Sequence, residues 1–504
     1  MSAISAQPND LADDPRIRGL LERDPVPMFI DGEWITGDQA QASTLIAPAT
    51  GAALCRVAVA GPAEIDRAVG AADTAFRDGR WSRLRPDERS RALDRWSDLL
   101  ERDADVLARL ETLHSGKSIT ESRGDVARAI DGVRFYAASA RNIRGETITV
   151  SAEHHTYTLL EPVGIVVAVV PWNVPLVLAI SKAAPALAAG NTVIVKPSQS
   201  TPLTALHIAR LWEEAGLPAG VLSVVTGPGG AVGEALCTDP RVTGITFTGS
   251  TETGLRLGSL AALQNKRTML ELGGKSPNIV LADADLDRAI QGASDAIFYG
   301  QGEICSAGSR LIVEDAVHDE VVDGVVALAR SLRVGDPMDP ETNMGSLISV
   351  AHRDGVLTAV EQAVARGATL AAGGVAPDVP GFAGGAFMQP TVLTGVAPDA
   401  TIACEEVFGP VLVVHRVADL EEAVEIANAT RFGLAAGIWT RDVALARRTM
   451  TRLEAGVVWI NDFNQFNPAM PFGGVKMSGS THREWSHLAL EAFMEHKSVW
   501  ERQT

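Results

Sequence analysis

The stretch that decides the fold is VGIVVAVVPWNVPLVLAISKAAPALAAGNTVIVKPSQS, residues 163–200. It opens with a β-rich apolar run at 163–170, continues with a helical pattern at 174–189 that Gly190 ends, and returns to a strand at 192–195. A short apolar run of this kind is typical of a buried strand. Because short apolar strands alternate with helices here, the stretch predicts right-handed βαβ units and a parallel sheet.

The alternation continues outward from this stretch in both directions. Further along, the expected elements are helices at 202–215 and 252–263, strands at 221–225 and 243–248, and a short helix between those strands. Before it, residues 61–140 have helical apolar spacing, clearest at 63–76 and 89–111. Three β-prone segments stand apart from the alternation: 145–150 and 156–160, which are expected to form a strand pair, and 498–500, another candidate strand. The alternation of strands and helices over residues 163–272 is the pattern of a dinucleotide-binding fold.

A second alternating stretch runs from about 274 to 478. Its expected elements are strands at 278–281 and 310–313 and helices at 285–298, 319–332 and 351–366. The chain is therefore expected to be an α/β protein in which a Rossmann-like parallel-sheet domain is joined to a second α/β domain.

Bulk composition excludes several classes of protein. The 504 residues are enough for two or three domains, and 46% hydrophobic and 21% charged residues are ordinary for a globular enzyme. A formal charge of −18 argues against a nucleic-acid partner, whose phosphates require a basic surface. No run approaches the roughly 18 apolar residues of a membrane span, and the first ten residues lack the features of a secretory signal.

The four cysteines, Cys55, Cys237, Cys305 and Cys404, form no CxxC pair. This spacing argues against a metal site or a disulfide framework and favours a reducing cytoplasm. Three of them are interpreted as small buried side chains, whereas Cys305 lies in the glycine-flanked run YGQGEICSAGSR (299–310). Glu271 opens a second such run, ELGGKSP (271–277). A thiolate nucleophile and a carboxylate that can activate water are the components of covalent thioester chemistry.

Six motifs together carry a resemblance to a known family. They are PWNVP (171–175), FTGSTETG (247–254), the Glu271 and Cys305 runs, EEVFGP (405–410) and PFGGVKMSG (471–479). In this order and at this spacing they resemble the aldehyde dehydrogenases of the NAD(P)-dependent, hydrolytic, non-acylating type, from about residue 28 to 499. The resemblance implies an NAD(P)-binding domain at 26–143 and 162–272, a catalytic domain at 273–478, and a small β oligomerisation arm formed by 144–161 and 479–504. Residues 1–25 are expected to form a loose arm.

The cofactor site is expected without the usual G-x-G-x-x-G fingerprint. Instead, residues 247–250 occupy a strand-to-helix junction, where a small residue and the free N–H groups of a helix N-terminus suit a pyrophosphate. Members of the family that strongly favour NAD carry a glutamate where Gln199 stands, so NADP is expected to be tolerated beside NAD. By resemblance the cofactor-binding residues are Val170, Pro171, Trp172, Lys196, Ser198, Gln199, Gly229, Gly233, Phe247, Thr248, Gly249, Ser250, Thr253, Leu272, Glu406 and Phe408.

The resemblance also assigns catalytic roles. Cys305 attacks the aldehyde, the Asn173 amide and the Cys305 N–H hold the oxyanion, and Glu271 activates the hydrolytic water. Lys182 and Glu484 are expected in a proton relay. After residue 479 the sequence departs from the family, because 480–487 is about one residue longer and lacks two glycines. The local backbone is therefore expected to differ around Glu484.

The positions that match the family's substrate tunnel form a moderately apolar set with few large aromatics and no arginine or lysine. They are Val174, Leu178, Ser181, Tyr299, Ile304, Asn464 and Phe466. Such a set favours a neutral aliphatic or aryl aldehyde over a semialdehyde with a distal carboxylate, which needs a cation, or a quaternary ammonium, which needs several aromatics.

Three alternatives remain at this point: a CoA-acylating relative, a non-catalytic structural protein on the same scaffold, and a thiol hydrolase or esterase that needs no nucleotide. The presence of Glu271, of Cys305 with Asn173, and of the cofactor motifs argues against each in turn. The partners expected are a small aldehyde and a second or further copy of the chain, as a homodimer or homotetramer, with neither nucleic acid nor membrane.

Overall fold

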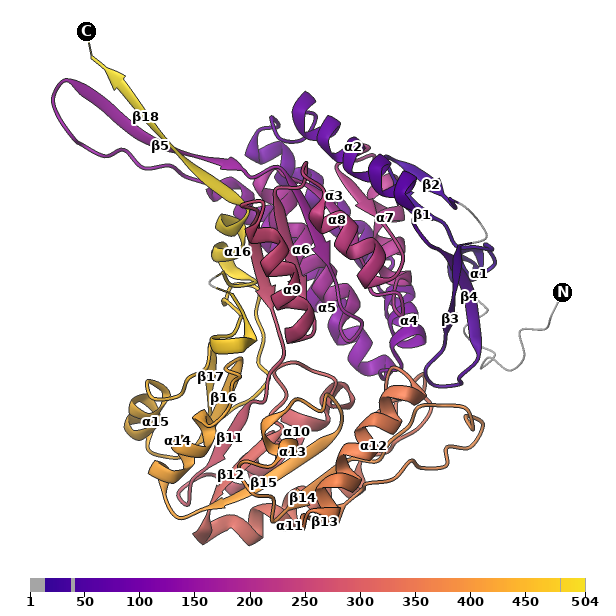
Figure 1. Ribbon diagram of the computed structural model, residues 1–504, viewed down its shortest axis with the longest axis vertical. Helices are drawn as coiled ribbons and strands as arrows, with labels where there is room; N and C mark the ends of the chain where they lie inside the picture. The colour runs from indigo at the N-terminus through magenta and orange to yellow at the C-terminus, as the bar shows by residue number, and fades with distance from the viewer. Residues whose placement is uncertain (1–13, 38–40, 481, 504) are drawn as a thin grey trace.

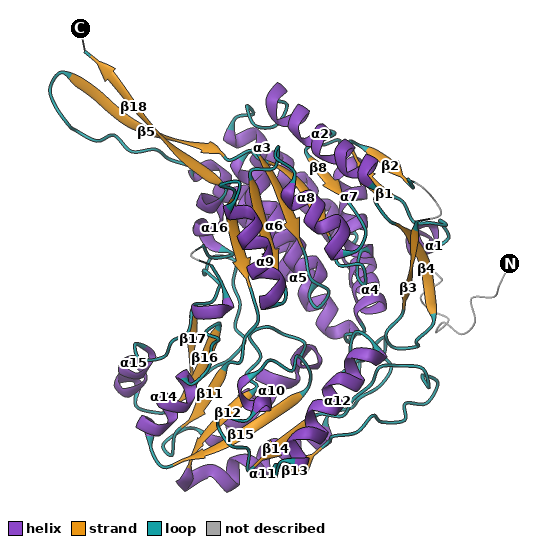
Figure 2. Ribbon diagram, in the orientation of Figure 1, coloured by secondary structure: helices purple, strands orange, loops and turns teal. Residues whose placement is uncertain are grey.

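The computed structural model describes residues 14–37, 41–480 and 482–503. Two α/β parts, each built around a seven-stranded sheet, lie one above the other in Figure 1, and a two-stranded β arm projects from the upper part. Figure 2 shows the helices that flank each sheet. The predicted α/β class, with two mostly parallel sheets and a β arm, is confirmed.

The first sheet has the strand order β10-β9-β6-β7-β8-β1-β2. Neighbours from β10 to β8 run parallel, and β1 and β2 are added antiparallel at the edge. The strands are β1 (Met28–Ile30), β2 (Glu33–Ile35), β6 (Ile165–Val169), β7 (Thr192–Lys196), β8 (Leu222–Val224), β9 (Gly244–Thr248) and β10 (Arg267–Glu271). The strands predicted at 163–170, 192–195, 221–225 and 243–248 are therefore confirmed.

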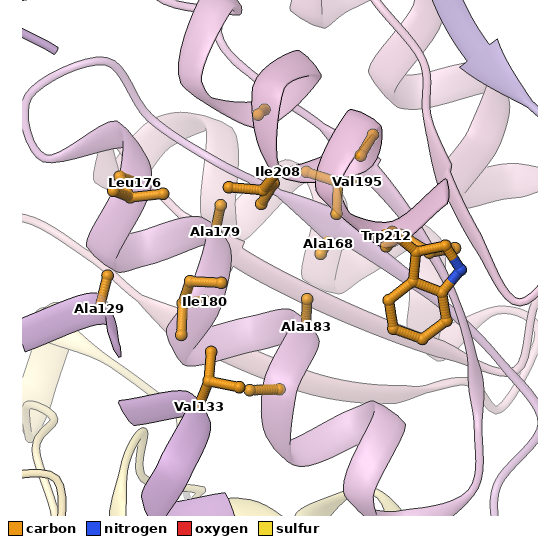
Figure 3. Packing of buried hydrophobic residues seen from close by; sticks show 14 of the residues in the cluster. Ala129, Val133, Ala168, Leu176, Ala179, Ile180, Ala183, Val195, Ile208 and Trp212 are labelled. Carbon is orange, nitrogen blue, oxygen red and sulfur yellow. The ribbon is translucent and has the colours of Figure 1, made fainter. Parts of the chain in front are cut away.

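Both faces of this sheet are covered. Val166 and Ala168 of β6 face one apolar cluster, which includes residues of the helices shown in Figure 3, whereas Ile165 and Val167 face another. This alternation explains why β6 reads as a continuous apolar run. The helices are α2 (Pro62–Asp78), α3 (Pro86–Arg102), α4 (Ala104–Ser115), α5 (Ile119–Ser139), α6 (Pro175–Ala189), α7 (Leu203–Glu214), α8 (Glu234–Thr238) and α9 (Thr251–Ala262).

The continuous helical pattern expected at 89–111 is interrupted. α3 ends and α4 begins on either side of Asp103, which has a non-helical backbone and a fully buried side chain. Its carboxylate accepts hydrogen bonds from Arg16, Arg102, His207 and Arg210. These long-range partners, which local periodicity does not reveal, stabilise the break.

The second sheet has the order β13-β14-β15-β12-β11-β16-β17 and is parallel except for β13. Its strands are β11 (Pro277–Val280), β12 (Arg310–Glu314), β13 (Thr369–Ala372), β14 (Thr391–Thr394), β15 (Val411–Val417), β16 (Ala435–Trp439) and β17 (Val457–Ile460). Its helices are α10 (Leu286–Phe298), α11 (His318–Ser331), α12 (Val350–Ala365), α13 (Thr401–Cys404), α14 (Leu420–Asn428) and α15 (Val443–Met450). The strands and helices predicted between 278 and 366 are confirmed.

The β arm pairs segments from distant parts of the chain. β5 (His154–Pro162) is antiparallel to β18 (Met494–Arg502) along its whole length, so the strand predicted at 498–500 is confirmed. The strand pair expected between 145–150 and 156–160 is reduced to an isolated bridge between Thr147 and Tyr157. β5 pairs with the C-terminal strand instead, because that strand offers nine successive partners. α16 (Ser486–Ala492) precedes β18.

A β-hairpin and a short helix lie before α2. β3 (Ala42–Ile46) and β4 (Ala53–Ala58) form an antiparallel hairpin. α1 (Pro15–Leu21) buries Ile17, and Arg16 Nη1 donates to Asp103 at 2.9 Å, which differs from the loose arm expected over 1–25. The rest of that expectation, residues 1–13, lies outside the described residues.

Candidate active site

Four predicted site residues lie where parallel strands of the first sheet end. Lys196, Thr248 and Glu271 are the last residues of β7, β9 and β10, and Asn173 follows β6 closely. β6 pairs with β7 on one side and with β9 on the other, so the strand order reverses at β6. In open α/β sheets this reversal creates a crevice at the carboxyl ends of the strands, where ligands bind.

Cys305 approaches this edge from the second α/β part. It lies in a turn, closed by the Ala307 N–H donating to the Ile304 carbonyl at 3.0 Å, in the connection between α10 and β12. A Cβ atom at Gly274 would lie 2.3 Å from the Cys305 carbonyl oxygen, so only glycine permits this contact. The glycine pair after Glu271 therefore brings the two predicted catalytic segments together.

The Asn173 side chain is directed at the same loop. Its Nδ2 donates to the Glu303 carbonyl at 2.8 Å, and it lines the same cavity as Cys305. The N-cap of α6 is Val174, so Asn173 does not cap that helix as an isolated asparagine at this place would. An amide nitrogen carries two N–H donors, and one remains for another acceptor.

Glu271 is buried, and neither carboxylate oxygen has a hydrogen-bond partner among the described residues. A Cβ atom at Gly473 would lie 2.4 Å from its Oε1, so the carboxylate packs against that glycine. Burial and the nearby Glu484 carboxylate raise the pKa of Glu271 well above its usual range. A carboxylate of raised pKa is a stronger base than an exposed one.

The surroundings of Cys305 disfavour a resting thiolate. Burial, followed by the carboxylates of Glu406, Glu271 and Glu484, raises the pKa of the Cys305 thiol to about 12. The nucleophile at neutral pH is therefore mostly a thiol, and its attack requires a group that takes the proton.

Lys182 and Glu484, predicted as relay members, are in direct contact and buried. Lys182 Nζ also donates to Thr248 Oγ1 at 2.6 Å, and Ser181 Oγ donates to the second Glu484 oxygen at 3.1 Å. In the segment around Glu484, Trp485 and Ser486 have positive φ. Two backbone hydrogen bonds of 2.8 Å between Glu484 and Phe472 fix the Glu484 backbone.

Cys305 lines a cavity of about 100 Å³. Six of the seven predicted pocket residues line it, and the seventh, Ser181, is hydrogen-bonded to Glu484 instead. The lining also includes residues that the sequence analysis missed: Asp125, Arg128, Val177, Ser306, Trp459, Phe472 and Trp485. The expectation of few large aromatics and no basic residue is therefore wrong for the whole lining. Residues far apart in sequence supply these side chains, and no local motif marks them.

The crevice fits a dinucleotide. Ser250 caps α9 by accepting from the Thr253 N–H at 3.3 Å, which leaves other N–H groups of the first turn for an anion. Lys196 is buried, its ammonium lies beside Gly229 and its aliphatic stem beside Gly233, and it donates to no described side chain or carbonyl. Burial lowers the pKa of Lys196 to about 8. A buried cation without a partner is a fitting site for a ribose or phosphate group.

The other predicted cofactor residues differ in their burial and in their contacts. The Glu406 carboxylate accepts from the Gly274 N–H at 3.0 Å, and Phe408 packs edge-on against Trp172 with their ring centroids 5.3 Å apart. Val170, Phe247 and Leu272 are buried, Pro171 is half-buried, and Gly249 donates to the Glu271 carbonyl at 3.1 Å. Gln199 is exposed, and Ser198 accepts from the Ser200 N–H at 3.3 Å.

His352 is a neighbour of this crevice that the sequence analysis missed. Its Nε2 lies 2.7 Å from the Phe408 carbonyl, and its ring packs against Trp172. Within the described ranges, no three or more His, Cys, Asp or Glu side chains group to hold a metal, and no helix is long and apolar enough to cross a membrane.

A crevice that suits a nucleotide lies beside a cavity that contains a thiol and an amide. This arrangement is typical of enzymes that use a nucleotide cofactor and a catalytic cysteine. The family model described as "Aldehyde dehydrogenase family" matches residues 34–499. The chain therefore belongs to the aldehyde dehydrogenase family and is an NAD(P)-dependent aldehyde dehydrogenase.

Named relatives agree with this assignment. The chain is 43% identical over 476 residues to the NADP/NAD-dependent aldehyde dehydrogenase PuuC of Escherichia coli (94% of this chain, 95% of the relative). It is 42% identical over 482 residues to human retinal dehydrogenase 2 (95% and 92%). The structure of the NAD+ complex of an aldehyde dehydrogenase from Bacillus cereus superposes with a TM-score of 0.94 at 41% identity (97% and 99%).

Proposed function

We propose that the chain oxidises a neutral aliphatic or aryl aldehyde to the carboxylic acid through a thioester on Cys305. The observation that carries the proposal is the cavity in which the Cys305 thiol and the Asn173 amide meet, next to the carboxyl edge of a parallel sheet. An enzyme of this kind needs a nucleophile, donors for the oxyanion and a base for water.

Cys305 Sγ forms a bond to the aldehyde carbon and loses its proton, and the carbonyl oxygen becomes an oxyanion. The second Asn173 N–H and the Cys305 backbone N–H stabilise that charge. The thiol proton needs an acceptor because the pKa of Cys305 is raised to about 12. Glu271 is the nearby unpartnered carboxylate whose raised pKa suits that task.

A nicotinamide cofactor, when bound, would supply the acceptor for the hydride that the substrate carbon loses. Lys196, Ser250 and Glu406 would hold the cofactor in the crevice, and Trp172 and Phe408 would position its ring. Loss of the hydride from the thiohemiacetal leaves a thioester on Cys305.

Glu271 first passes the thiol proton to Lys182 and Glu484 and becomes a carboxylate again. It then removes a proton from water, the hydroxide adds to the thioester carbon, and the C–S bond breaks. The departing Cys305 sulfur takes that proton back from Glu271, which yields the carboxylic acid and the free thiol. Lys182, Thr248 and Glu484 form a connected set that would carry the proton away from this site. The presence of this base supports hydrolysis over transfer of the acyl group to CoA.

The cavity walls support an aryl or aliphatic aldehyde. Phe466 packs against both Phe472 and Trp485, with ring centroids 5.3 and 5.5 Å apart, and so offers aromatic surface to a ring. The same aromatics would suit a quaternary ammonium, but Arg128 on the wall offers only N–H donors, for which a quaternary ammonium has no acceptor. Gln199 leaves room for NADP beside NAD, because an amide does not repel a 2′-phosphate.

The predicted organisation remains part of the proposal: 26–143 and 162–272 bind the nucleotide, 273–478 carry the nucleophile, and 144–161 and 479–504 join copies of the chain in a dimer or tetramer. Exposed Trp500 and Leu159 on the β arm support such contacts. Light scattering with and without residues 494–504 tests this assembly. A cytoplasmic location is proposed from the free cysteines.

Absorbance at 340 nm tests the reaction, with neutral, anionic and cationic aldehydes, each supplied with NAD+ and with NADP+. Turnover of neutral aldehydes by the native chain and none by Cys305→Ala is the expected result. Turnover that survives Cys305→Ala, or a preference for the charged aldehydes, would overturn the proposal. Folding of the variant is checked by circular dichroism.

A further inference from the structure

One part of the cavity wall is polar although the wall is otherwise mostly apolar. Arg128 of α5 lines the cavity and donates through Nη1 to Asp125 Oδ1 at 3.2 Å and to the Tyr299 hydroxyl at 3.1 Å. Its Nη2 and Nε donate to no described residue, and its side chain is 41% exposed. The guanidinium lines the cavity that contains Cys305 and therefore has N–H groups that no described residue occupies.

Neighbouring side chains fix the position of the Arg128 guanidinium. Asp125 is 2% exposed and its other oxygen accepts from Lys117 Nζ at 2.6 Å, so the carboxylate cannot turn away. The guanidinium carbon lies 5.6 Å from the centroid of the Tyr299 ring. The Gly300 N–H donates to Glu121 at 2.7 Å, which fixes the segment that carries Tyr299.

Tyr299 supplies a second polar atom on the same wall. Burial and the Asp125 carboxylate raise the pKa of Tyr299, so its hydroxyl stays protonated and donates to Asp125 at 3.4 Å. Arg128 and Tyr299 thus share Asp125 as their acceptor, and the remaining Arg128 donors are left for a ligand.

The charges around Arg128 balance. The carboxylates of Asp125 and Glu111 face the cations Lys117 and Arg128. Burial alone would raise the pKa of Glu111, but His114 and Lys117 lower it. Glu121 has its pKa raised by burial to about 7, and His114 is kept neutral because burial lowers its pKa. Arg128 is therefore not a surplus cation. A ligand with a full negative charge would compete with Asp125, whereas a neutral acceptor adds to the existing pair.

We propose that Arg128, positioned by Asp125 and Tyr299, accepts substrates that carry a neutral hydrogen-bond acceptor, such as a carbonyl or ether oxygen, at the end remote from the aldehyde. The inference rests on the proposed function and narrows its substrate class to polar-ended aldehydes whose middle is apolar. The aromatic side chains bind that middle, and Arg128 selects the far end.

The test compares two aldehydes of nearly equal shape, 4-acetylbenzaldehyde and 4-isopropylbenzaldehyde, in the native full-length chain and in Arg128→Met. Methionine keeps an apolar stem of similar length and removes the donors. The variant is expected to lose about tenfold in kcat/KM for the acetyl compound and less than about twofold for the isopropyl compound, because a hydrogen bond to a charged donor contributes this much. The loss falls mainly on KM.

Arg134→Met is the matched control. Arg134 lies on the same helix with a side chain 42% exposed and an ion pair to Glu101, away from the cavity lining. It is expected to change neither substrate's kcat/KM by more than about twofold. Tyr299→Phe, which removes one partner of Arg128, is expected to weaken the discrimination only in part.

Equal losses for the two compounds in Arg128→Met would overturn the inference, as would a preference of the native chain for 4-carboxybenzaldehyde over 4-acetylbenzaldehyde. Unsubstituted benzaldehyde separates this failure from failure of the proposed function. If benzaldehyde is oxidised and Arg128→Met has the same kcat/KM values as Arg134→Met for both substituted benzaldehydes, only the role of Arg128 is wrong. If no aldehyde is oxidised, the proposed function is wrong as well.

Discussion

The ammonium group of Lys182 on α6 donates to the carboxylate of Glu484, 302 residues further along the chain, and both side chains are almost completely buried. Neither residue has an exposed alternative, so each charge depends on the other. The contact joins α6, which follows β6, to the segment that precedes α16 and β18.

A double-mutant cycle tests this dependence. Lys182→Met and Glu484→Gln are each expected to destabilise the fold by about 3–5 kcal/mol, because each leaves a buried charge without its partner. The double variant is expected to lose much less than the sum of the two. Thermal unfolding followed by circular dichroism measures the effect, and strictly additive losses would show that the two charges are independent.

Asp103 predicts a second stability effect. Although burial alone would raise its pKa, His207 and Arg102 hold the pKa of Asp103 well below its usual range. Asp103→Asn is expected to cost about 3–5 kcal/mol near pH 7, because the arginines around it lose their acceptor. Since the native pKa is depressed, this stabilisation is complete above the unfolded value of about 3.9 and is lost as the pH falls below it.

The midpoint of urea unfolding, measured between pH 7 and 3, reports that loss. The difference in midpoint between the native chain and Asp103→Asn should become smaller toward pH 3. Asp98→Asn on α3, the helix that ends before Asp103, serves as the control, because the Asp98 side chain is 73% exposed. A gap that stays constant across this range would contradict the assigned network.

The strand–helix alternation was predictable because it follows from local sequence, and the site residues were predictable from the six motifs that resemble the family. Asn173 and Glu271 lie next to apolar runs whose direction in a parallel sheet places them at one edge. The partner of β5 was not predictable, because pairing with β18 depends on a contact between segments more than 300 residues apart. Arg128 and Asp125 were missed for a different reason: on α5 they look like an ordinary solvated i,i+3 pair, and only packing against Tyr299 places them in the cavity wall.

The raised pKa of Cys305 predicts a steep pH profile for alkylation. With a thiol pKa of about 12, the thiolate fraction should rise about tenfold for each pH unit between about 7 and 10. Iodoacetamide labelling followed by peptide mass spectrometry measures the rate at Cys305 in the chain without nucleotide. A rate that levels off below pH 9 would show that the thiol is already ionised there.

Asn173→Ala is expected to lower kcat by about 10²–10³-fold, because one oxyanion donor is removed. Binding of nucleotide should be unchanged, since the amide faces the Glu303 carbonyl and the aldehyde cavity. Steady-state kinetics and a fluorescence titration with NADH measure the two quantities. Asn142→Ala on the exposed surface is the control, and an equal fall in that variant would remove the argument for Asn173.

Gln199→Glu should convert cofactor tolerance into preference for NAD+. A carboxylate at this exposed position accepts hydrogen bonds from a ribose hydroxyl but repels a 2′-phosphate, so kcat/KM for NADP+ should fall at least tenfold while that for NAD+ is retained. Gln264→Glu, also exposed, should change neither value. Equal behaviour of the two variants would place Gln199 outside the cofactor site.

The central claim is that Cys305 carries the acyl group and that Glu271 activates the water that releases it. The most direct measurement is intact-protein and peptide mass spectrometry of Glu271→Gln after mixing with NAD+ and benzaldehyde. We predict a mass increase of one benzoyl group on the peptide that contains Cys305, absent without NAD+ and absent in the Cys305→Ala/Glu271→Gln double variant. A fully active Glu271→Gln chain that shows no adduct, or an acyl group on a different cysteine, would contradict the account.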